Sequence, residues 1–171
     1  MTRSRAGSIS RVAGALMTLT LVAGETSSAD DAAENKRAVR RLYDELFSKW
    51  NFAVVDELFS PAFIGHEMPP GTPLGPEGIR QFYGRIRAGL PDVKLTVDDL
   101  IGEGDKVVVR WRAQATHTGV FLDIPPTGKA VSFTGMAIYR LSKGKIVERW
   151  VEVDLLGLTQ QLREAATAPG E

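Results

Sequence analysis

The chain has 171 residues, of which 43% are apolar and 25% charged, a balance typical of one folded domain with a hydrophobic core. Its 21 basic residues equal its 21 acidic ones, and no basic run lies beyond the first eleven positions, which argues against a nucleic-acid partner. Cysteine is absent, and this excludes disulfides, thiolate metal sites and thiol catalysis.

The first 29 residues have the pattern of an export signal. Arg3, Arg5 and Arg11 precede residues 12–24, a run of 13 residues without charge. That run is shorter than the roughly 20 residues of a membrane-spanning helix, and small residues at 22–24 and 27–29 suit a cleavage site. We therefore expect a cleaved signal over residues 1–29, a periplasmic or secreted protein, and no stable membrane anchor. The alternative is a leader that is not a signal, in a cytoplasmic protein.

The next segment changes from small, polar residues to a helical pattern. Residues 30–35 are interpreted as a linker. Apolar residues then recur at intervals of three and four with charged residues between them, which predicts an amphipathic helix interrupted at Asn51. Its apolar stripe consists of Val39, Leu42, Tyr43, Leu46, Phe47 and Trp50. A second, shorter helix is expected over residues 53–59, before Pro61.

A loop and a third helix follow. Residues 63–67 are compatible with a brief strand, and residues 68–75, with three prolines and two glycines, predict an ordered loop. Pro76 and Glu77 suit the start of a helix that is expected to stop near residue 89. Its apolar side consists of Ile79, Phe82, Tyr83 and Ile86.

After Asp92 the apolar residues alternate with polar ones, which predicts strands. Strands are expected from residue 93 and over residues 106–117, 131–141 and 145–154, with a short helix from Leu155. Helices followed by a run of strands indicate an α+β domain, here residues 36–163, with a flexible tail at 164–171. We expect a curved antiparallel sheet wrapped over three N-terminal helices, an α+β barrel that encloses a conical cavity.

The last predicted strand carries charge on one face. A period of two places Arg149 among valines on one side, and Glu148, Trp150, Glu152 and Asp154 on the other. Because a large aromatic ring gains most from burial, we expect the face of Trp150 to be at least partly enclosed. Asp154 is then the candidate acid of a pocket.

Several stretches of the chain together resemble a known family. They are residues 39–43 (VRRLY), Phe63 with His66, residues 75–78 (GPEG), 91–92 (PD), 104–111 (GDKVVVRW), 116–119 (THTG) and 124–128 (IPPTG), and the segment from Glu148-Arg149-Trp150 through Asp154 to Gln160-Gln161-Leu162. In this order and spacing, residues 36–162 resemble the SnoaL-like polyketide cyclases, also called ester cyclases, whose superfamily has the nuclear-transport-factor-two-like fold.

The resemblance implies a reaction and a set of residues. In the family, an aspartate on the last strand is the acid/base of an intramolecular aldol ring closure, with histidine help and no metal or organic cofactor. By position, that aspartate is similar to Asp154, and the histidines to His66 and His117. The resemblance also implies a homodimer. The chemistry suits these residue types, because an aldol closure needs a base beside a carbonyl and a donor for the developing oxyanion.

Each of these residues also has a structural interpretation. Asp154 could cap the short helix that follows it, and His117 could be a hydrogen-bonded histidine at a strand end. A wall containing Trp150 and Trp111 would raise the pKa of an enclosed aspartate. The helix residues Tyr43, Phe47, Phe82 and Tyr83 are interpreted as core, with pocket lining as the second possibility. Glu148 and Glu152 are expected to pair with arginines across the sheet rather than to be catalytic.

Two classes of function therefore compete. Two histidines fifty residues apart do not form a metal-ligand cluster, so no metal site is expected. The first hypothesis is a cofactor-independent enzyme acting on a small apolar or carbonyl-containing molecule; an isomerase, dehydratase or hydrolase variant belongs to the same class. The second is a noncatalytic module that binds a ligand or dimerises. An exported protein would be an awkward partner for cytoplasmic polyketide synthases, which argues against antibiotic ring closure.

Overall fold

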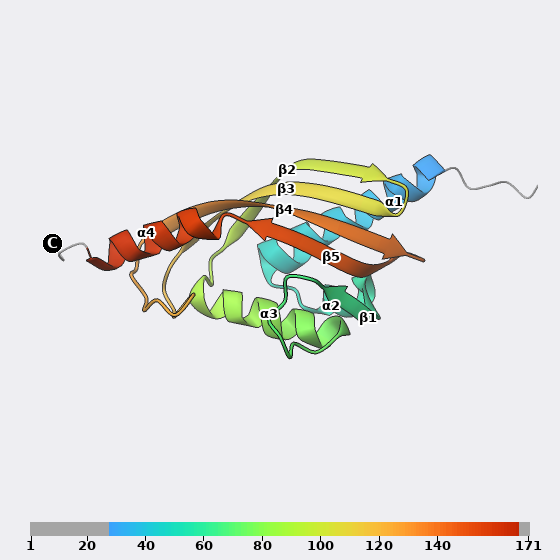
Figure 1. Cartoon of the computed structure of the whole chain (residues 1–171). Coiled ribbons are helices and arrows are strands. Elements are labelled where there is room, and N and C mark those ends of the chain that lie inside the picture. Colours follow the sequence, from blue (N-terminus) through green and yellow to red (C-terminus); the bar gives the residue numbers. More distant parts are fainter. Residues whose placement is uncertain (1–27, 168–171) are drawn as a thin grey trace, which may run out of the picture.

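The computed structural model describes residues 28–167 (Figure 1). The helices and strands follow one another along the chain in the order that the sequence predicts. The helices are α1 (Ser28–Leu42), the π-helix η1 (Tyr43–Phe47), α2 (Ala53–Leu58), α3 (Gly75–Gly89) and α4 (Leu155–Thr167). The strands are β1 (Phe59–Gly65), β2 (Lys94–Glu103), β3 (Lys106–Thr116), β4 (Ala130–Ser142) and β5 (Lys145–Val153).

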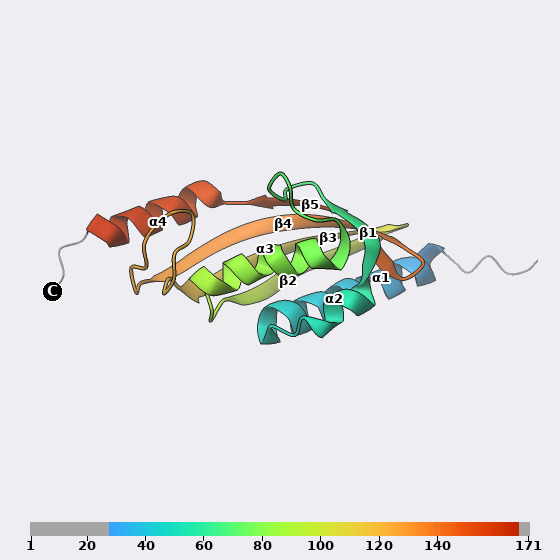
Figure 2. The ribbon, with the colours of Figure 1, turned by 90° about the horizontal axis from the view of Figure 1, so that it is seen from below.

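The long strands β2 to β5 form the upper layer of the molecule in Figure 1, with α2, α3 and the short strand β1 beneath them and α1 running obliquely behind them. The strand order is β1-β5-β4-β3-β2, so the five strands do not close into a complete barrel. The long strands pair antiparallel, whereas β1 pairs parallel with β5. Seen from below, α3 runs along the middle of the sheet, and α1 and α2 lie side by side (Figure 2). The α+β class and the curved sheet over three helices are confirmed.

The core lies between the concave face of the sheet and these helices. Alternate residues of β3 are buried from Val107 to Ala115, as a strand with one face on a core requires. The apolar stripe predicted for the first helix is continued by η1, which buries Tyr43, Leu46 and Phe47. A π-helix places an extra residue in the turn and so changes which side chains face inward.

Three of the predicted segments, the export signal, the linker and the C-terminal tail, lie at or beyond the ends of the described residues. Most of the expected export signal lies outside the described residues. The helix α1 begins at Ser28, so residues 30–35 are helical rather than a linker; alanine and glutamate favour a helix there, and Ala32 is buried against the core. At the other end, α4 extends to Thr167, within the expected tail. Within residues 28–167, no helix is long and apolar enough to span a membrane.

A β-bulge in β5 decides which of its residues face the core. Leu141 pairs with Ile146, but Arg140 pairs with Glu148, which leaves Val147 as an extra residue. Without the bulge, alternation from Ile146 would turn Trp150 inward. With it, Arg149 is fully buried opposite Tyr139. Trp150 therefore lies on the convex face of the sheet, where it is 36% exposed, and not in the core.

The convex face of the sheet carries exposed apolar side chains. Met136, Ile138 and Trp150 are 54%, 39% and 36% exposed, on the adjacent strands β4 and β5. Trp150 stacks on His66 of the segment after β1, with ring centroids 4.7 Å apart. The expected homodimer stays a prediction.

A close approach between β3 and β4 positions one large side chain of the core. Gly135 pairs directly with Trp111, and a Cβ atom at Gly135 would lie 2.3 Å from the indole and 2.7 Å from the carbonyl oxygen of Glu152. Only glycine leaves room for the ring here. The indole then lies against Phe133, with ring centroids 5.9 Å apart.

We expect Gly135→Ala to lower the free energy of unfolding by about 1–3 kcal/mol, because the indole of Trp111 must move. Gly84→Ala is the matched control, since nothing lies within 4 Å of a Cβ there and alanine favours the interior of α3 by about 0.5–1 kcal/mol. Urea unfolding of both variants measures the difference. Equal stability of the two variants would contradict the tight packing.

Candidate functional site

A cavity of about 650 Å³ lies between the concave face of the sheet and the elements η1 and α3. Its volume is in the range of small-molecule sites. Most of its wall is apolar or aromatic, including Phe47, Trp50, Phe82, Ile86, Leu95, Trp111, Phe121, Phe133, Val151 and Val153. Its polar wall residues fall into two groups. Tyr43, Glu67, Tyr83, Tyr139 and Arg149 are largely buried, whereas Arg85, Asp123 and Glu152 are exposed at the rim.

Arg149 is the fully buried charge of this cavity. Its guanidinium carbon lies 5.3 Å from the ring centre of Tyr83, 5.6 Å from that of Phe82 and 5.9 Å from that of Phe63. These distances allow cation–π attraction to all three rings. Burial disfavours the charged form of Arg149. Its electrostatic interactions with Tyr83 and Glu67 outweigh this effect, so the pKa of Arg149 is raised above its ordinary value.

Glu67 supplies the opposite charge from the loop after β1. Its Oε1 accepts hydrogen bonds from Nε of Arg149, at 2.7 Å, and from Nη2 of the same guanidinium. Its other oxygen, Oε2, is buried and has no hydrogen-bond partner in the structure. A buried carboxylate oxygen without a partner is costly. Glu67 is among the residues that line the cavity, and Oε2 is the atom whose capacity to accept a hydrogen bond is unused.

Three hydroxyl groups lie in the same cavity. Tyr83 accepts a hydrogen bond from Nη1 of Arg149, and Tyr139 donates to Tyr43 at 3.2 Å. Burial raises the pKa of Tyr43, Tyr83 and Tyr139. All three therefore keep their protons at neutral pH, and Tyr83 can donate its own hydrogen to a bound oxygen.

Together these groups provide one hydrogen-bond acceptor and one hydrogen-bond donor. The planar guanidinium of Arg149 joins the Glu67 carboxylate to the Tyr83 hydroxyl, so an acceptor and a donor are held by one rigid fork. The surrounding aromatic walls limit water, which strengthens electrostatic interactions. Such an arrangement can accept a proton at one atom and stabilise negative charge at another.

Asp154 lies elsewhere. Its side chain is exposed, and its Oδ1 accepts a hydrogen bond from the backbone N–H of Gly157 at 2.9 Å. This is the helix-capping geometry that the sequence offered as the alternative. Asp154 is not among the residues that line the cavity. Its predicted catalytic role is untested and has no support from this geometry.

Neither histidine lines the cavity. His117 is fully buried at the end of β3, where its Nδ1 lies 3.2 Å from the hydroxyl of Thr127 and its Nε2 has no partner in the structure. His66 lies on the convex side, with its Nε2 3.9 Å from a carboxylate oxygen of Glu148. The structure does not bring Asp154, His66 and His117 together in one pocket.

The predicted pocket-lining residues separate into two groups. Trp111, Tyr43, Phe47, Phe82 and Tyr83 all line the cavity. Trp150 does not, because the bulge at Val147 turns it to the convex face. Whether the five lining residues contact a substrate stays a prediction.

Sequence reasoning missed Arg149, Glu67 and Tyr139. One signal for Arg149 was present, since it is the only charged residue in a row otherwise made of valines, at 147, 151 and 153. A lone charge in an apolar row indicates a buried, paired group. Glu67 gave no such signal, because it lies in an irregular segment whose direction the sequence does not specify.

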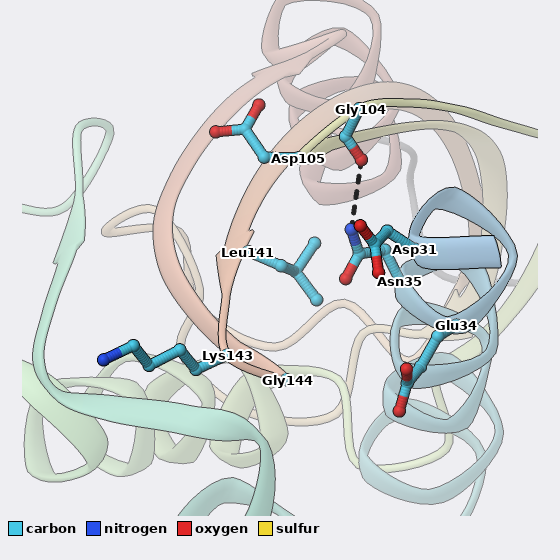
Figure 3. Close-up of a pocket in the computed structure, with 8 residues that line it drawn as sticks. All are labelled: Asp31, Glu34, Asn35, Gly104, Asp105, Leu141, Lys143 and Gly144. Carbon is cyan, nitrogen blue, oxygen red and sulfur yellow. Dashed lines mark hydrogen bonds between the residues drawn. The ribbon is translucent and has the colours of Figure 1, made fainter. Parts of the chain in front are cut away.

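A second hollow, of about 530 Å³, lies where α1 meets the turns at residues 104–105 and 143–144 (Figure 3). It is lined mainly by polar groups, and the amide of Asn35 donates to the carbonyl oxygen of Gly104 at 3.2 Å. Over residues 28–167, no group of three or more histidine, aspartate or glutamate side chains could hold a metal ion. The apolar cavity is therefore the better candidate site.

Known proteins share this architecture. Residues 37–162 match the family model of the SnoaL-like polyketide cyclases. A solved protein from Jannaschia sp. CCS1, classed as a SnoaL-like polyketide cyclase, is 27% identical over 81% of this chain and 95% of its own, with a TM-score of 0.71. IdmH from Streptomyces antibioticus, described as a polyketide cyclase, is 31% identical over 75% of this chain and 98% of its own, with a TM-score of 0.66. TsrD from Streptomyces laurentii is 29% identical over 76% and 95%, with a TM-score of 0.70. Comparison with curated proteins gave no match.

We expect Arg149→Met to lower the free energy of unfolding by about 3–5 kcal/mol, because Glu67 is then left without its charged partner. The double variant Arg149→Met/Glu67→Gln should be less destabilised than the sum of the two single changes. A double-mutant cycle by urea unfolding measures this coupling. Additive effects would show that the ion pair contributes nothing beyond packing.

The buried tyrosines predict a loss of stability at high pH. The unfolded chain releases its phenolic protons near pH 10, whereas the folded chain holds them to higher pH. The free energy of unfolding should therefore be unaffected by these groups below about pH 10 and fall above it, by up to about 1.4 kcal/mol per pH unit for each tyrosine. Urea unfolding from pH 8 to 11 measures the slope, and Tyr83→Phe should make it shallower. Tyrosinate absorbance at 295 nm from the folded protein at pH 10 would contradict this.

Proposed function

Because the chain belongs to the SnoaL-like polyketide cyclase family, we propose that it is a cofactor-independent enzyme that closes a ring by acid/base chemistry on an apolar carbonyl compound. One observation carries the proposal. Glu67, through its Oε1, and the hydroxyl of Tyr83 are held on the same guanidinium among residues that line an aromatic cavity, and Oε2 of Glu67 is left buried without a partner.

The proposed reaction is an intramolecular aldol closure. Oε2 of Glu67 removes a proton from the carbon beside a carbonyl group, and Tyr83 donates a hydrogen bond to the enolate oxygen that forms. The enolate carbon then attacks a second carbonyl carbon of the same molecule. The proton on Glu67 returns to the resulting alkoxide, so the product has the same atoms as the substrate and no co-reactant is needed.

Arg149 has a supporting role in this scheme. It holds Glu67 and Tyr83 in fixed positions, and its charge polarises the Tyr83 hydroxyl, which strengthens that group as a donor. The apolar walls contributed by Phe82, Trp111 and Phe133 suit the flat, apolar body of a conjugated carbonyl compound.

This proposal differs from the residue assignment that the family resemblance implied. The resemblance points to Asp154, whose carboxylate instead caps α4 and is exposed. Glu67 is the carboxylate that the cavity offers. The two assignments give opposite results on mutation, so they can be separated.

A noncatalytic binding module remains the second candidate. The same cavity would then hold a small apolar molecule without changing it, and Glu67 would accept a hydrogen bond from a hydroxyl or amino group of the ligand. What favours this reading is that Arg149 and Glu67 are already paired with each other, as in a structural ion pair. Turnover by the wild type separates the two candidates.

We expect Glu67→Gln to reduce turnover by about 100-fold or more while substrate binding persists, because the amide keeps the shape but cannot take the proton. Poly-β-keto esters, followed by chromatographic change at constant mass, are the first substrates to test. Glu103→Gln, an exposed carboxylate at the end of β2 that does not line the cavity, is the matched control and should keep wild-type turnover.

Asp154→Asn tests the other assignment in the same assay. We expect it to lose part of a helix cap, about 1 kcal/mol of stability or less, and to keep turnover. Loss of turnover in Asp154→Asn with full activity in Glu67→Gln would reject Glu67 as the base. Tight binding by the wild type with no turnover of any substrate would favour the binding module.

A further inference from the structure

Unusual backbone conformations gather around the cavity. Within residues 28–167, four residues other than glycine have a positive φ: Trp50, Leu122, Asp123 and Lys143. Three of them, Trp50, Leu122 and Asp123, line the cavity. Lys143 has the same φ as Leu122, 51°, but it lies in the β4–β5 turn and does not line the cavity.

Leu122 has the least favourable side chain for its turn. Phe121 and Ile124 exchange two backbone hydrogen bonds, of 3.1 and 3.0 Å, around Leu122 and Asp123. Two central residues with positive φ are the pattern of a type I′ turn, which prefers asparagine, aspartate or glycine. Leucine has no side-chain hydrogen bond to offset the strain of this conformation.

Burial does not explain the leucine either. Its side chain is 42% exposed, and two neighbours at the same rim, Val120 and Leu155, are 65% and 50% exposed. All three line the cavity, and together we call them the apolar mouth. A strained residue whose side chain is not buried lowers the stability of the fold. This favours a role for the Leu122 side chain in contacting a bound molecule.

The mouth is held rigidly. The backbone N–H groups of Thr118 and Gly119 both donate to the carbonyl oxygen of Gly89 at 3.1 Å, which fixes the segment to the end of α3. A Cβ at Gly119 would lie 2.0 Å from the carbonyl oxygen of Ala88, so the two segments touch. On the other side, the indole N–H of Trp50 donates to the carbonyl oxygen of Pro91 at 2.9 Å.

We infer that Leu122 is a specificity-determining residue of the cavity and that it contacts the apolar end of the ligand. The polar groups of Glu67 and Tyr83 hold the other end. The ligand class is then an elongated, uncharged molecule with an oxygen or nitrogen donor at one end and an apolar group at the other. This inference rests on the proposed function only in requiring that the cavity bind a small apolar molecule.

The test uses the full chain and 1-aminoanthracene, an uncharged fluorescent compound with three fused rings and one amino group. Leu122→Asn keeps a side chain of similar size, suits a positive φ and removes the apolar contact. We expect it to raise the melting temperature by about 2 °C and to weaken binding of the probe about 5- to 10-fold. Lys143→Asn relieves the same strain elsewhere and should raise the melting temperature while leaving binding unchanged.

Each outcome bears on the inference. Unchanged probe binding by Leu122→Asn overturns it, as does a lower melting temperature, which would show that leucine is there for stability. Leu122→Gly, which also suits a positive φ, should weaken binding in the same way and guards against an effect of the asparagine itself. If the wild type binds no probe, this inference fails, and the proposed function is decided separately by the turnover of the wild type and of Glu67→Gln. Binding by the wild type that Leu122→Asn does not weaken removes only the role of Leu122.

Discussion

The buried charge of Arg149 is the constraint on which the rest of the cavity depends. A guanidinium in a protein core stays charged, so its surroundings must supply an opposite charge, acceptors and aromatic faces. Glu67, Tyr83, Phe63 and Phe82 do so from three different elements. Strand β1, the loop after it and helix α3 are thereby fixed to strand β5 around a single group.

The same requirement leaves the cavity polar at one place and apolar elsewhere. Arg149 uses one carboxylate oxygen of Glu67 and leaves the other buried and without a partner. It also binds the Tyr83 oxygen and leaves that hydroxyl free to donate. The interactions that stabilise the fold therefore also leave one acceptor and one donor unused among the residues that line the cavity.

The sequence predicts the elements of this fold well and the site only in part. Periodicity placed Tyr43, Phe47, Phe82 and Tyr83 on inward-facing helix stripes because helical spacing is a local property. It also placed Arg149 and Trp150 on opposite faces of β5, but the large indole was taken as the sign of the enclosed face, and which face a strand turns to the core depends on its pairing with its neighbours rather than on the strand alone. Periodicity could not find Glu67, whose position comes from the path of a loop and a long-range ion pair. The parallel pairing of β1 with β5 was missed for the same reason.

The bulge at Val147 has a consequence for how proteins of this architecture could diverge. If β5 paired with β4 without the bulge, so that Val147 lay opposite Arg140, the two faces of the strand beyond that point would exchange, with Trp150 inward and Arg149 on the convex side. The sheet, the helices and the chain order would stay the same. A one-residue change in the pairing of β5 could therefore replace a charged cavity wall by an aromatic one, so overall shape is a poor guide to chemistry among such relatives.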